Sequence, residues 1–554
     1  MVTQEQYAQS RPNRSPGDEG SSLDGPGATI PPSQRLTGLV FIRKLGAASR
    51  FLILALASAA SAPLAPTAAL YAQRAGAAQK DAGIPPARLD SLRAHIRRVM
   101  DSTKTPSIAV AVARNGRIIW EEGFGFADLE RRTPSTPATL YSMASISKPI
   151  TATGLMKLVE QGRIDLDRPA NDYLGSARIT GIAGPASGAT VRRVLAHTAG
   201  LPLHYRFFYD GGSVTRPSMD EAITRYAITV YPPGATYSYS NLGYGVLEEI
   251  IAKVSGRPYE EFMRDEVFKP LGMTTATIGT GAGIANSAVR YTAQGKPIAF
   301  YDFDHRAASA VYTSAHELVR FGMFHLKNHL RDQRAVLKDA TLDSMHRLAT
   351  PGDTATGYGL GWLIGTEQGM RVVSHTGGMP GVATTLKLYP QHNVAIVALA
   401  NASGAAPHRV ALDIAAAVLP GYNAPGRAPT PPVFASSAEL AGEWTGTVRT
   451  YDGATTPIAL LVKSDDVHVR LGGPEALWTV LNAPTFRNGM LSGQFAGTIP
   501  SEEARRFPHN VGMGLLLQGD TLRGWAAAMT TDDPLTGAMS SYAELTRKGT
   551  APGR

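Results

Sequence analysis

The hydrophobic pattern of residues 87–128 changes from that of a helix to that of two strands. In residues 87–100, apolar side chains recur at the three- and four-residue spacing of an amphipathic helix. In residues 107–128, two β-branched runs flank Asn115 and Gly116, a pair that accepts the positive φ angles of a tight turn. The pattern therefore predicts a helix followed by a β-hairpin.

Strand patterns return from residue 358, after a long middle region rich in helices and loops. Residues 241–256 have the pattern of a helix that ends at a glycine, and residues 410–419 the pattern of a closing helix. Strands near both ends of residues 87–420 suggest one sheet that both ends of the region complete, with a helical insertion against it. This arrangement is an α+β fold.

Two further segments follow this region. Residues 421–437 are rich in proline and are predicted to be a linker. Residues 438–548 alternate short apolar runs with turn residues, which predicts a small all-β domain, either a barrel or a sandwich.

The N-terminal segment has the pattern of an export signal. Residues 1–40 are polar and rich in Pro, Gly and Ser, which predicts disorder. Residues 41–72 contain a basic start, a short apolar run and a small-residue exit, as in a secretory signal peptide. We expect cleavage near Ala72 and a periplasmic or secreted protein. The alternative is an uncleaved anchor, which would be the protein's only contact with a membrane.

Composition narrows the chemistry. The chain has 554 residues, a formal net charge of +9 and no cysteine. The absence of cysteine excludes thiol nucleophiles, thiolate metal sites and disulfides. The basic residues are scattered, which argues against nucleic acid as a partner. His, Asp and Glu show no metal-ligand spacing along the sequence, so we expect no metal site.

One serine-lysine motif is a candidate for nucleophilic catalysis. Ser145 and Lys148 form the only Ser-x-x-Lys in the chain, and on a helix this spacing places the amine one turn from the hydroxyl. Pro149 is tolerated only in a first helical turn, so the helix should begin close to Ser145. A residue before proline is pushed away from helical angles, however, which conflicts with a helical Lys148. By chance alone, on the order of one such tetrad is expected in a chain of this composition.

Two more motifs strengthen the case that the Ser-x-x-Lys tetrad is catalytic rather than a chance match. Tyr239 and Asn241 lie directly before and at the start of the helix predicted for 241–256, and His375, Thr376 and Gly377 end an apolar strand. In this order the three motifs resemble those of the serine β-lactamase and penicillin-binding-protein superfamily, specifically its class C-like branch. That branch includes D-alanyl-D-alanine carboxypeptidases, D-aminopeptidases and related esterases. The resemblance covers roughly residues 87–420 and implies an antiparallel sheet flanked by helices, with a helical subdomain.

The resemblance also implies roles for individual residues. Ser145 would be the nucleophile, and Lys148 and Tyr239 would carry protons, with either one as the base during acylation. Asn241 would hydrogen-bond Lys148 and the substrate amide, and His375, Thr376 and Gly377 would line the substrate site. The backbone N–H groups of Ser145 and Gly378 would form an oxyanion hole, where one donor is worth about 3 kcal/mol to the transition state.

The implied enzyme needs no metal and no cofactor, and it acts through an acyl-enzyme on a small-molecule or peptide amide or ester. One departure bears on the substrate. The third motif of β-lactamases usually begins with lysine, whereas this chain has His375, which is mostly neutral at pH 7. This residue favours a peptidase or esterase. A true β-lactamase and a non-catalytic protein that has kept the penicillin-binding fold are the alternatives. His197 is assigned to a structural loop beside the site.

Overall fold

The computed structural model describes residues 83–212, 214–351, 356–423, 433–530 and 537–549. The predicted disordered segment 1–40, the predicted signal peptide 41–72 and part of the predicted linker 421–437 lie outside these residues. No helix among the described residues has both the length and the apolar character needed to cross a bilayer.

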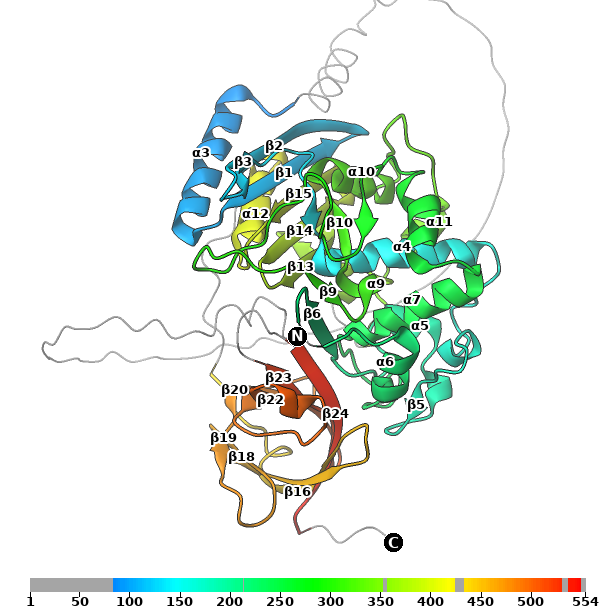
Figure 1. The fold of residues 1–554 in the computed structure, drawn as a ribbon, viewed down its shortest axis with the longest axis vertical. Helices are drawn as coiled ribbons and strands as arrows, with labels where there is room; N and C mark the ends of the chain where they lie inside the picture. The colour runs from blue at the N-terminus through cyan, green and yellow to red at the C-terminus, as the bar shows by residue number, and fades with distance from the viewer. Residues whose placement is uncertain (1–82, 213, 352–355, 424–432, 531–536, 550–554) are drawn as a thin grey trace, which may run out of the picture. The chain divides into compact units, whose positions relative to one another are not determined.

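An eight-stranded antiparallel sheet forms the centre of the larger part of the protein (Figure 1). Its strand order is β11-β12-β13-β14-β15-β1-β2-β3, so the first and last segments of this region meet at the β1–β15 pair, as the sequence predicted. The turn between β1 and β2 has positive φ at Asn115 and Gly116, which confirms the predicted hairpin. The strands are β1 Ser107–Arg114, β2 Arg117–Asp128, β3 Thr133–Pro134, β11 Gly357–Tyr358, β12 Leu363–Glu367, β13 Met370–Met379, β14 Val382–Tyr389 and β15 Val394–Ala400.

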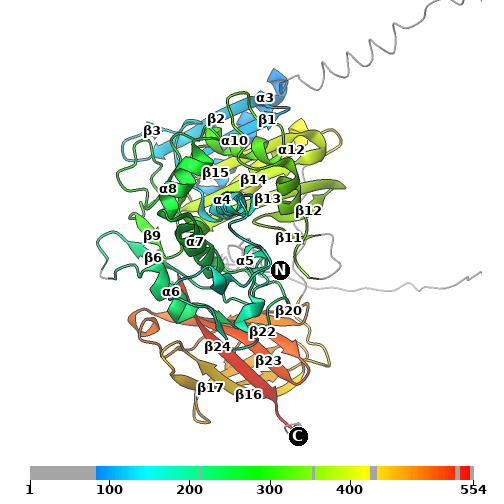
Figure 2. The ribbon, with the colours of Figure 1, turned by 90° about the vertical axis from the view of Figure 1, so that its right-hand side faces the viewer.

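Both faces of this sheet are covered by helices. Strand β1 alternates between branched residues, which pack with α3 (Pro86–Thr103) and α12 (Ala406–Val418), and alanines, which face the core that contains α10 (Ala315–His325). A strand buried on both faces is therefore apolar throughout rather than alternating with polar residues. Figure 2 shows α3 and α12 beside the sheet.

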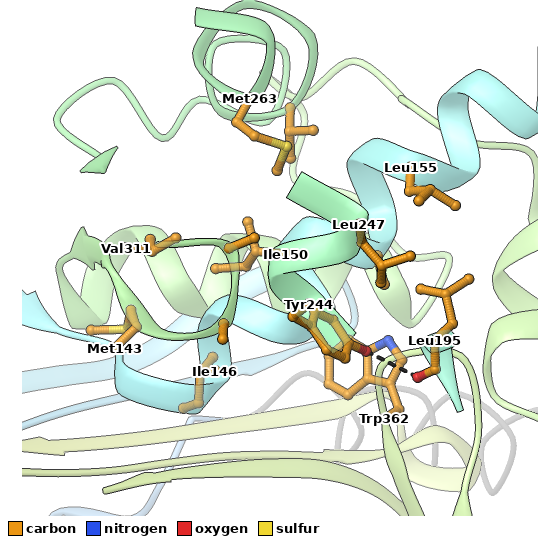
Figure 3. Close-up of a cluster of buried hydrophobic side chains, with 14 of the residues drawn as sticks. Met143, Ile146, Ile150, Leu155, Leu195, Tyr244, Leu247, Met263, Val311 and Trp362 are labelled. Atoms are coloured by element: carbon orange, nitrogen blue, oxygen red, sulfur yellow. Dashed lines mark hydrogen bonds between the residues drawn. The ribbon is translucent and has the colours of Figure 1, made fainter. Parts of the chain in front are cut away.

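A helical region packs against the α10 face. Its main helices are α4 (Ser147–Glu160) and α7 (Asn241–Ser255), and α7 ends at Gly256 in the left-handed conformation, as predicted. Figure 3 shows Ile150 and Leu155 of α4 close to Tyr244 and Leu247 of α7. This core holds the start of α4 firmly between the sheet and α7.

The C-terminal strands form a second antiparallel sheet, which curls around one hydrophobic core and is barrel-like. The fold class predicted from sequence is therefore confirmed, and the barrel alternative fits better than two stacked sheets. The strands are β16 Gly442–Arg449, β17 Thr455–Val462, β18 Val467–Leu471, β19 Thr479–Val480, β20 Asn482–Arg487, β21 Met490–Phe495, β22 His509–Gln518, β23 Thr521–Thr530 and β24 Gly537–Arg547.

Strand β24 also pairs with β6 (Tyr205–Tyr209), which in turn pairs with β9 (Tyr301–Phe303). Close to this contact, the buried Glu503 lies 3.2 Å from Arg206 and 2.7 Å from Arg225. The C-terminal sheet is thus joined to the helical region by backbone pairing and by a buried ion cluster.

Candidate active site

Ser145 lies on a short 3₁₀ turn, Ala144–Ile146, which runs directly into α4. Pro149 falls in the first turn of α4, where its missing N–H costs no helical hydrogen bond. Lys148 is helical although it precedes a proline, because tertiary packing overcomes the local preference against helical angles there. Lys148 Nζ lies 3.1 Å from Ser145 Oγ. The structure therefore brings the two residues of the first motif into hydrogen-bond contact.

The amine of Lys148 is fully buried and has polar but uncharged partners. Nζ is 2.8 Å from Asn241 Oδ1 and 3.0 Å from the carbonyl oxygen of Ala308 in the short helix α9 (Arg306–Ser309). Among the described residues no carboxylate pairs with Lys148, and burial holds the pKa of this amine well below its usual value. A neutral amine has two N–H bonds and one lone pair. In the neutral form, N–H bonds to the two carbonyl-type oxygens leave the lone pair of the amine for the hydroxyl of Ser145.

Tyr239 is a second side chain that contacts Ser145. Its hydroxyl hydrogen-bonds Ser145, and its ring centroid is 4.8 Å from Lys148 Nζ. Burial raises the pKa of this phenol, so it stays protonated at neutral pH. Ser145 is thus in contact with both the amine of Lys148 and the phenol of Tyr239.

The neighbouring serines have other contacts. Ser147 Oγ accepts a hydrogen bond of 3.1 Å from the Val311 amide, so it fixes the start of α4 against β10 (Val311–Thr313). Ser142 lies on β4 (Tyr141–Ser142), and its hydroxyl has no hydrogen-bond partner among the described residues. Of the three serines, only Ser145 contacts the lysine amine.

Strand β13 closes another side of the site. A Cβ atom on Gly377 would lie 2.3 Å from the Met143 carbonyl oxygen and 2.3 Å from Thr384 Oγ1, so only glycine allows the strand to approach the turn that carries Ser145. Thr384 Oγ1 donates to the same Met143 oxygen at 2.9 Å. Thr376 and Gly378 flank Gly377 on this strand.

His375 is neutral in this setting. Burial lowers its pKa to about 3. Its Nδ1–H donates to the Thr376 carbonyl oxygen at 2.7 Å, which leaves Nε2 to accept from the Tyr358 hydroxyl at 2.8 Å. The third motif therefore presents no positive charge.

Sequence reasoning missed several residues that surround the site. Tyr358 and the Ala308 carbonyl belong to segments that were given no role. His197 is predicted to lie in a structural loop beside the site, and it also contacts site residues directly. Its ring centroid lies 4.4 Å from that of Tyr239, and its Nδ1 accepts a hydrogen bond of 3.1 Å from the Ser240 amide. A backbone carbonyl has no sequence signature, and single aromatic residues outside a motif carry none either.

A buried lysine that contacts a serine at the start of a helix, beside a glycine-rich strand edge, is the arrangement expected of a serine hydrolase of the Ser-Lys type. Residues 92–419 match the family model described as Beta-lactamase. The chain therefore belongs to the Beta-lactamase family, which confirms the family resemblance predicted from the three motifs.

Curated relatives agree with this assignment. The chain is 25% identical to penicillin-binding protein 4* of Bacillus subtilis over 53% of its own length and 67% of that protein. It is 29% identical to the putative penicillin-binding protein PbpX of Bacillus subtilis over 49% of its length and 64% of that protein. The chain thus spans about two thirds of the length of these relatives.

Solved structures show the same fold. The crystal structure of SurE with D-Leu matches with a TM-score of 0.56 at 21% identity, over 84% of this chain and all of that one. The octameric penicillin-binding protein homologue from Pyrococcus abyssi matches with a TM-score of 0.52 at 21% identity, over 82% of this chain and all of that one. Both matches extend beyond residues 92–419, so the likeness in fold includes strands of the C-terminal sheet.

Proposed function

We propose that this protein is an exported serine hydrolase that forms an acyl-enzyme on Ser145 with a small-molecule or peptide amide or ester. The hydrogen-bond arrangement of Lys148 supports this proposal most directly. Nζ lies within hydrogen-bond distance of Asn241 Oδ1, the Ala308 carbonyl oxygen and Ser145 Oγ. In the proposed neutral form, two N–H bonds go to the first two oxygens and the lone pair serves Ser145. An amine held in this way is a base rather than a counter-ion.

In the proposed acylation step, Lys148 removes the proton of Ser145 as Oγ attacks the substrate carbonyl carbon. The carbonyl oxygen becomes an oxyanion that accepts hydrogen bonds from the backbone N–H groups of Ser145 and Gly378. When the tetrahedral intermediate collapses, Tyr239 gives its proton to the leaving group and recovers one from Lys148. In deacylation the proton transfers run in reverse. Water attacks the acyl-enzyme and gives a proton to Tyr239, which passes its own to Lys148. Lys148 then returns a proton to Ser145 Oγ as the acyl–oxygen bond breaks.

This scheme assigns the acylation base to Lys148, because burial shifts the two candidates in opposite directions. Burial lowers the pKa of Lys148 well below its usual value, which favours the neutral amine as a base. Burial raises the pKa of Tyr239, so the phenolate is scarce at neutral pH. Tyr239 therefore serves as a proton donor, and Asn241 orients both Lys148 and the substrate amide.

The third motif supports the proposed substrate class. His375 is neutral, so it gives no ionic contact to a substrate carboxylate at the position where β-lactamases usually carry lysine. We therefore favour esterase or peptidase action. Thr376 and Gly377 would contact the substrate through the strand edge of β13. β-Lactam hydrolysis is the second candidate, favoured by the penicillin-binding proteins among the relatives.

Residues 87–420 are proposed as the hydrolase domain, 421–437 as the linker and 438–548 as the C-terminal β domain. The N-terminal segment is proposed to direct export, with 1–40 as a disordered extension and 41–72 as a signal peptide.

A substrate panel tests the function. Short-chain p-nitrophenyl esters, D-aminoacyl amides, D-Ala-D-Ala peptides and nitrocefin are each assayed with the wild type and with Ser145→Ala. We expect turnover of an ester or amide that the variant lacks. Nitrocefin as the best substrate would instead identify a β-lactamase. No turnover and no covalent adduct with any of the four classes would favour the non-catalytic binding protein.

A further inference from the structure

Three ligand-type side chains converge at one end of the β6–β9 ribbon. The two strands run antiparallel, with Phe207 opposite Phe303. His204 directly precedes β6, while Asp304 and His305 directly follow β9, so the pairing brings all three to the same end. Their side chains are at most 1% exposed. Since about one hundred residues separate them, no spacing in the sequence could reveal the cluster.

The distances within the cluster fit a metal coordination sphere. His204 Nε2 lies 3.3 Å from Asp304 Oδ2, and His305 Nε2 lies 3.4 Å from the same oxygen. One ligand atom from each residue lies within 4.8 Å of the others. A tetrahedral zinc ion with bonds of about 2.0–2.1 Å separates its ligand atoms by about 3.3–3.4 Å. The two measured separations equal that edge length.

Several buried polar atoms of the cluster lack hydrogen-bond partners. Within the described residues, Asp304 Oδ1 and both ring nitrogens of His305 have no hydrogen-bond partner, although they are buried. The Ser540 amide lies 3.5 Å from His204 Nδ1, at the outer limit of a hydrogen bond, so it does not fix the tautomer of that ring. Buried polar atoms without partners are costly, and a bound ion is one way in which proteins satisfy them.

We propose that His204, Asp304 and His305 form a structural site for a divalent cation of the zinc class. Two imidazoles and one carboxylate suit Zn²⁺ or Co²⁺, whereas Ca²⁺ and Mg²⁺ prefer oxygen ligands. Water supplies the fourth position of the tetrahedron. The cation takes no part in acyl transfer.

The charges around the cluster are compatible with a cation. Arg206 and Arg216 are nearby positive side chains, and each lies within 3.3 Å of a carboxylate oxygen, Arg206 of Glu503 and Arg216 of Asp302. The two arginines therefore add no unpaired positive charge. The carboxylate of Asp304, in contrast, has no arginine or lysine side chain as an ion-pair partner in the described part of the chain.

The position of the cluster gives the cation a structural role. His305 directly precedes α9, and the Ala308 carbonyl of α9 accepts the hydrogen bond from Lys148. In addition, the Ala307 carbonyl accepts a hydrogen bond of 2.7 Å from Thr151 of α4. A cation bound at His305 would fix the residue directly before α9 and, through this helix, the Ala308 carbonyl that accepts from Lys148.

Metal titration of the full chain tests the site. The purified protein is stripped with a chelator and titrated with ZnCl₂, and in a parallel sample with CoCl₂. We expect one equivalent of zinc per chain, a rise in Tm of several degrees, and the visible absorption bands of tetrahedral Co²⁺. Asp304→Asn should weaken zinc binding by at least about 100-fold, while His316→Gln should leave it unchanged. His316 is the matched control, because it is a partly exposed histidine 2.8 Å from Glu121.

The outcomes distinguish zinc bound at the cluster from zinc bound elsewhere on the protein and from no bound zinc. If Asp304→Asn fails to fold, His204→Gln replaces it, and the cobalt spectrum of the wild type needs no variant at all. Absence of bound zinc in the wild type would overturn the proposal and leave the cluster as a hydrogen-bond network with water. Undiminished zinc binding in Asp304→Asn would also overturn it, because the metal would then be held at surface histidines.

Discussion

Asn241→Asp changes the charge next to Lys148 without changing the size of its partner. The native amide oxygen lies 2.8 Å from Nζ, and the variant replaces the neutral amide with a carboxylate. A negative charge at that distance stabilises the protonated amine, so the pKa of Lys148 should rise towards its usual value. Because the neutral amine is the proposed base, the variant should need a higher pH to reach its full rate.

The size of the effect follows from the distance. Two opposite unit charges 4 Å apart attract by about 4 kcal/mol at the effective dielectric constant of protein sites, and opposite charges at such range move a pKa by about 1–3 pH units. The acid limb of kcat/KM should therefore move upwards by about 1–3 pH units. At pH values below the wild-type limb, the variant should be about 10- to 1000-fold slower.

The assay is ester hydrolysis followed across the pH range in which the protein is folded, with kcat/KM fitted at each pH. Asn286→Asp is the control, since Asn286 is exposed and has a positive φ that aspartate also tolerates. We expect its profile to match the wild type. An unmoved acid limb in Asn241→Asp would refute the reasoning, because the group that titrates could then not be the amine bonded to Asn241.

Three further predictions concern the same arrangement. In the unfolded chain Lys148 keeps its proton up to its usual pKa of 10.5, whereas in the folded chain it loses the proton at lower pH. The urea-unfolding free energy of the wild type should therefore rise with pH relative to that of Lys148→Met between about pH 7 and pH 10. Parallel curves of unfolding free energy against pH would contradict a lowered pKa. Gly377→Ala should cut kcat by at least about 10-fold through a clash with the turn before Ser145, whereas Gly365→Ala, whose Cβ would meet its nearest atom at 3.4 Å, should keep wild-type kinetics; equal rates would refute the close approach. Glu503→Gln should lower the unfolding free energy by about 3 kcal/mol because it leaves a buried arginine unpaired, whereas the exposed Glu502→Gln should cost less than about 1 kcal/mol; equal losses in thermal melts would show that the buried ion cluster is not important.

Local patterns predicted much of the fold because their information is local. The hairpin around Asn115 and the helix that ends at Gly256 each depend on one or two residues that accept positive φ. The antiparallel sheet and the barrel-like C-terminal domain follow from strand patterns and turn residues. In contrast, the local preference of a residue before proline argued against a helical Lys148, and tertiary packing overcame it.

The candidate site was predictable where it consists of motifs and unpredictable where it consists of contacts. Ser145, Lys148 and Tyr239 stand in motifs whose order carries the resemblance to the family. The carbonyl of Ala308 is a backbone group, which any residue could supply. The hydroxyl of Tyr358 on β11 reaches His375 on β13 because the sheet places these strands one strand apart. Tertiary contacts of this kind have no counterpart in spacing along the chain.

Covalent labelling of the nucleophile tests the central claim most directly. The wild type, Ser145→Ala and Ser147→Ala are each treated with a fluorophosphonate, and the modified residue is located by mass spectrometry of the intact chain and of its peptides. The arrangement of Lys148 and Tyr239 around one hydroxyl predicts a single adduct on Ser145 in the wild type and in Ser147→Ala, and none in Ser145→Ala. An adduct on another serine, or equal labelling of Ser145→Ala, would contradict the account.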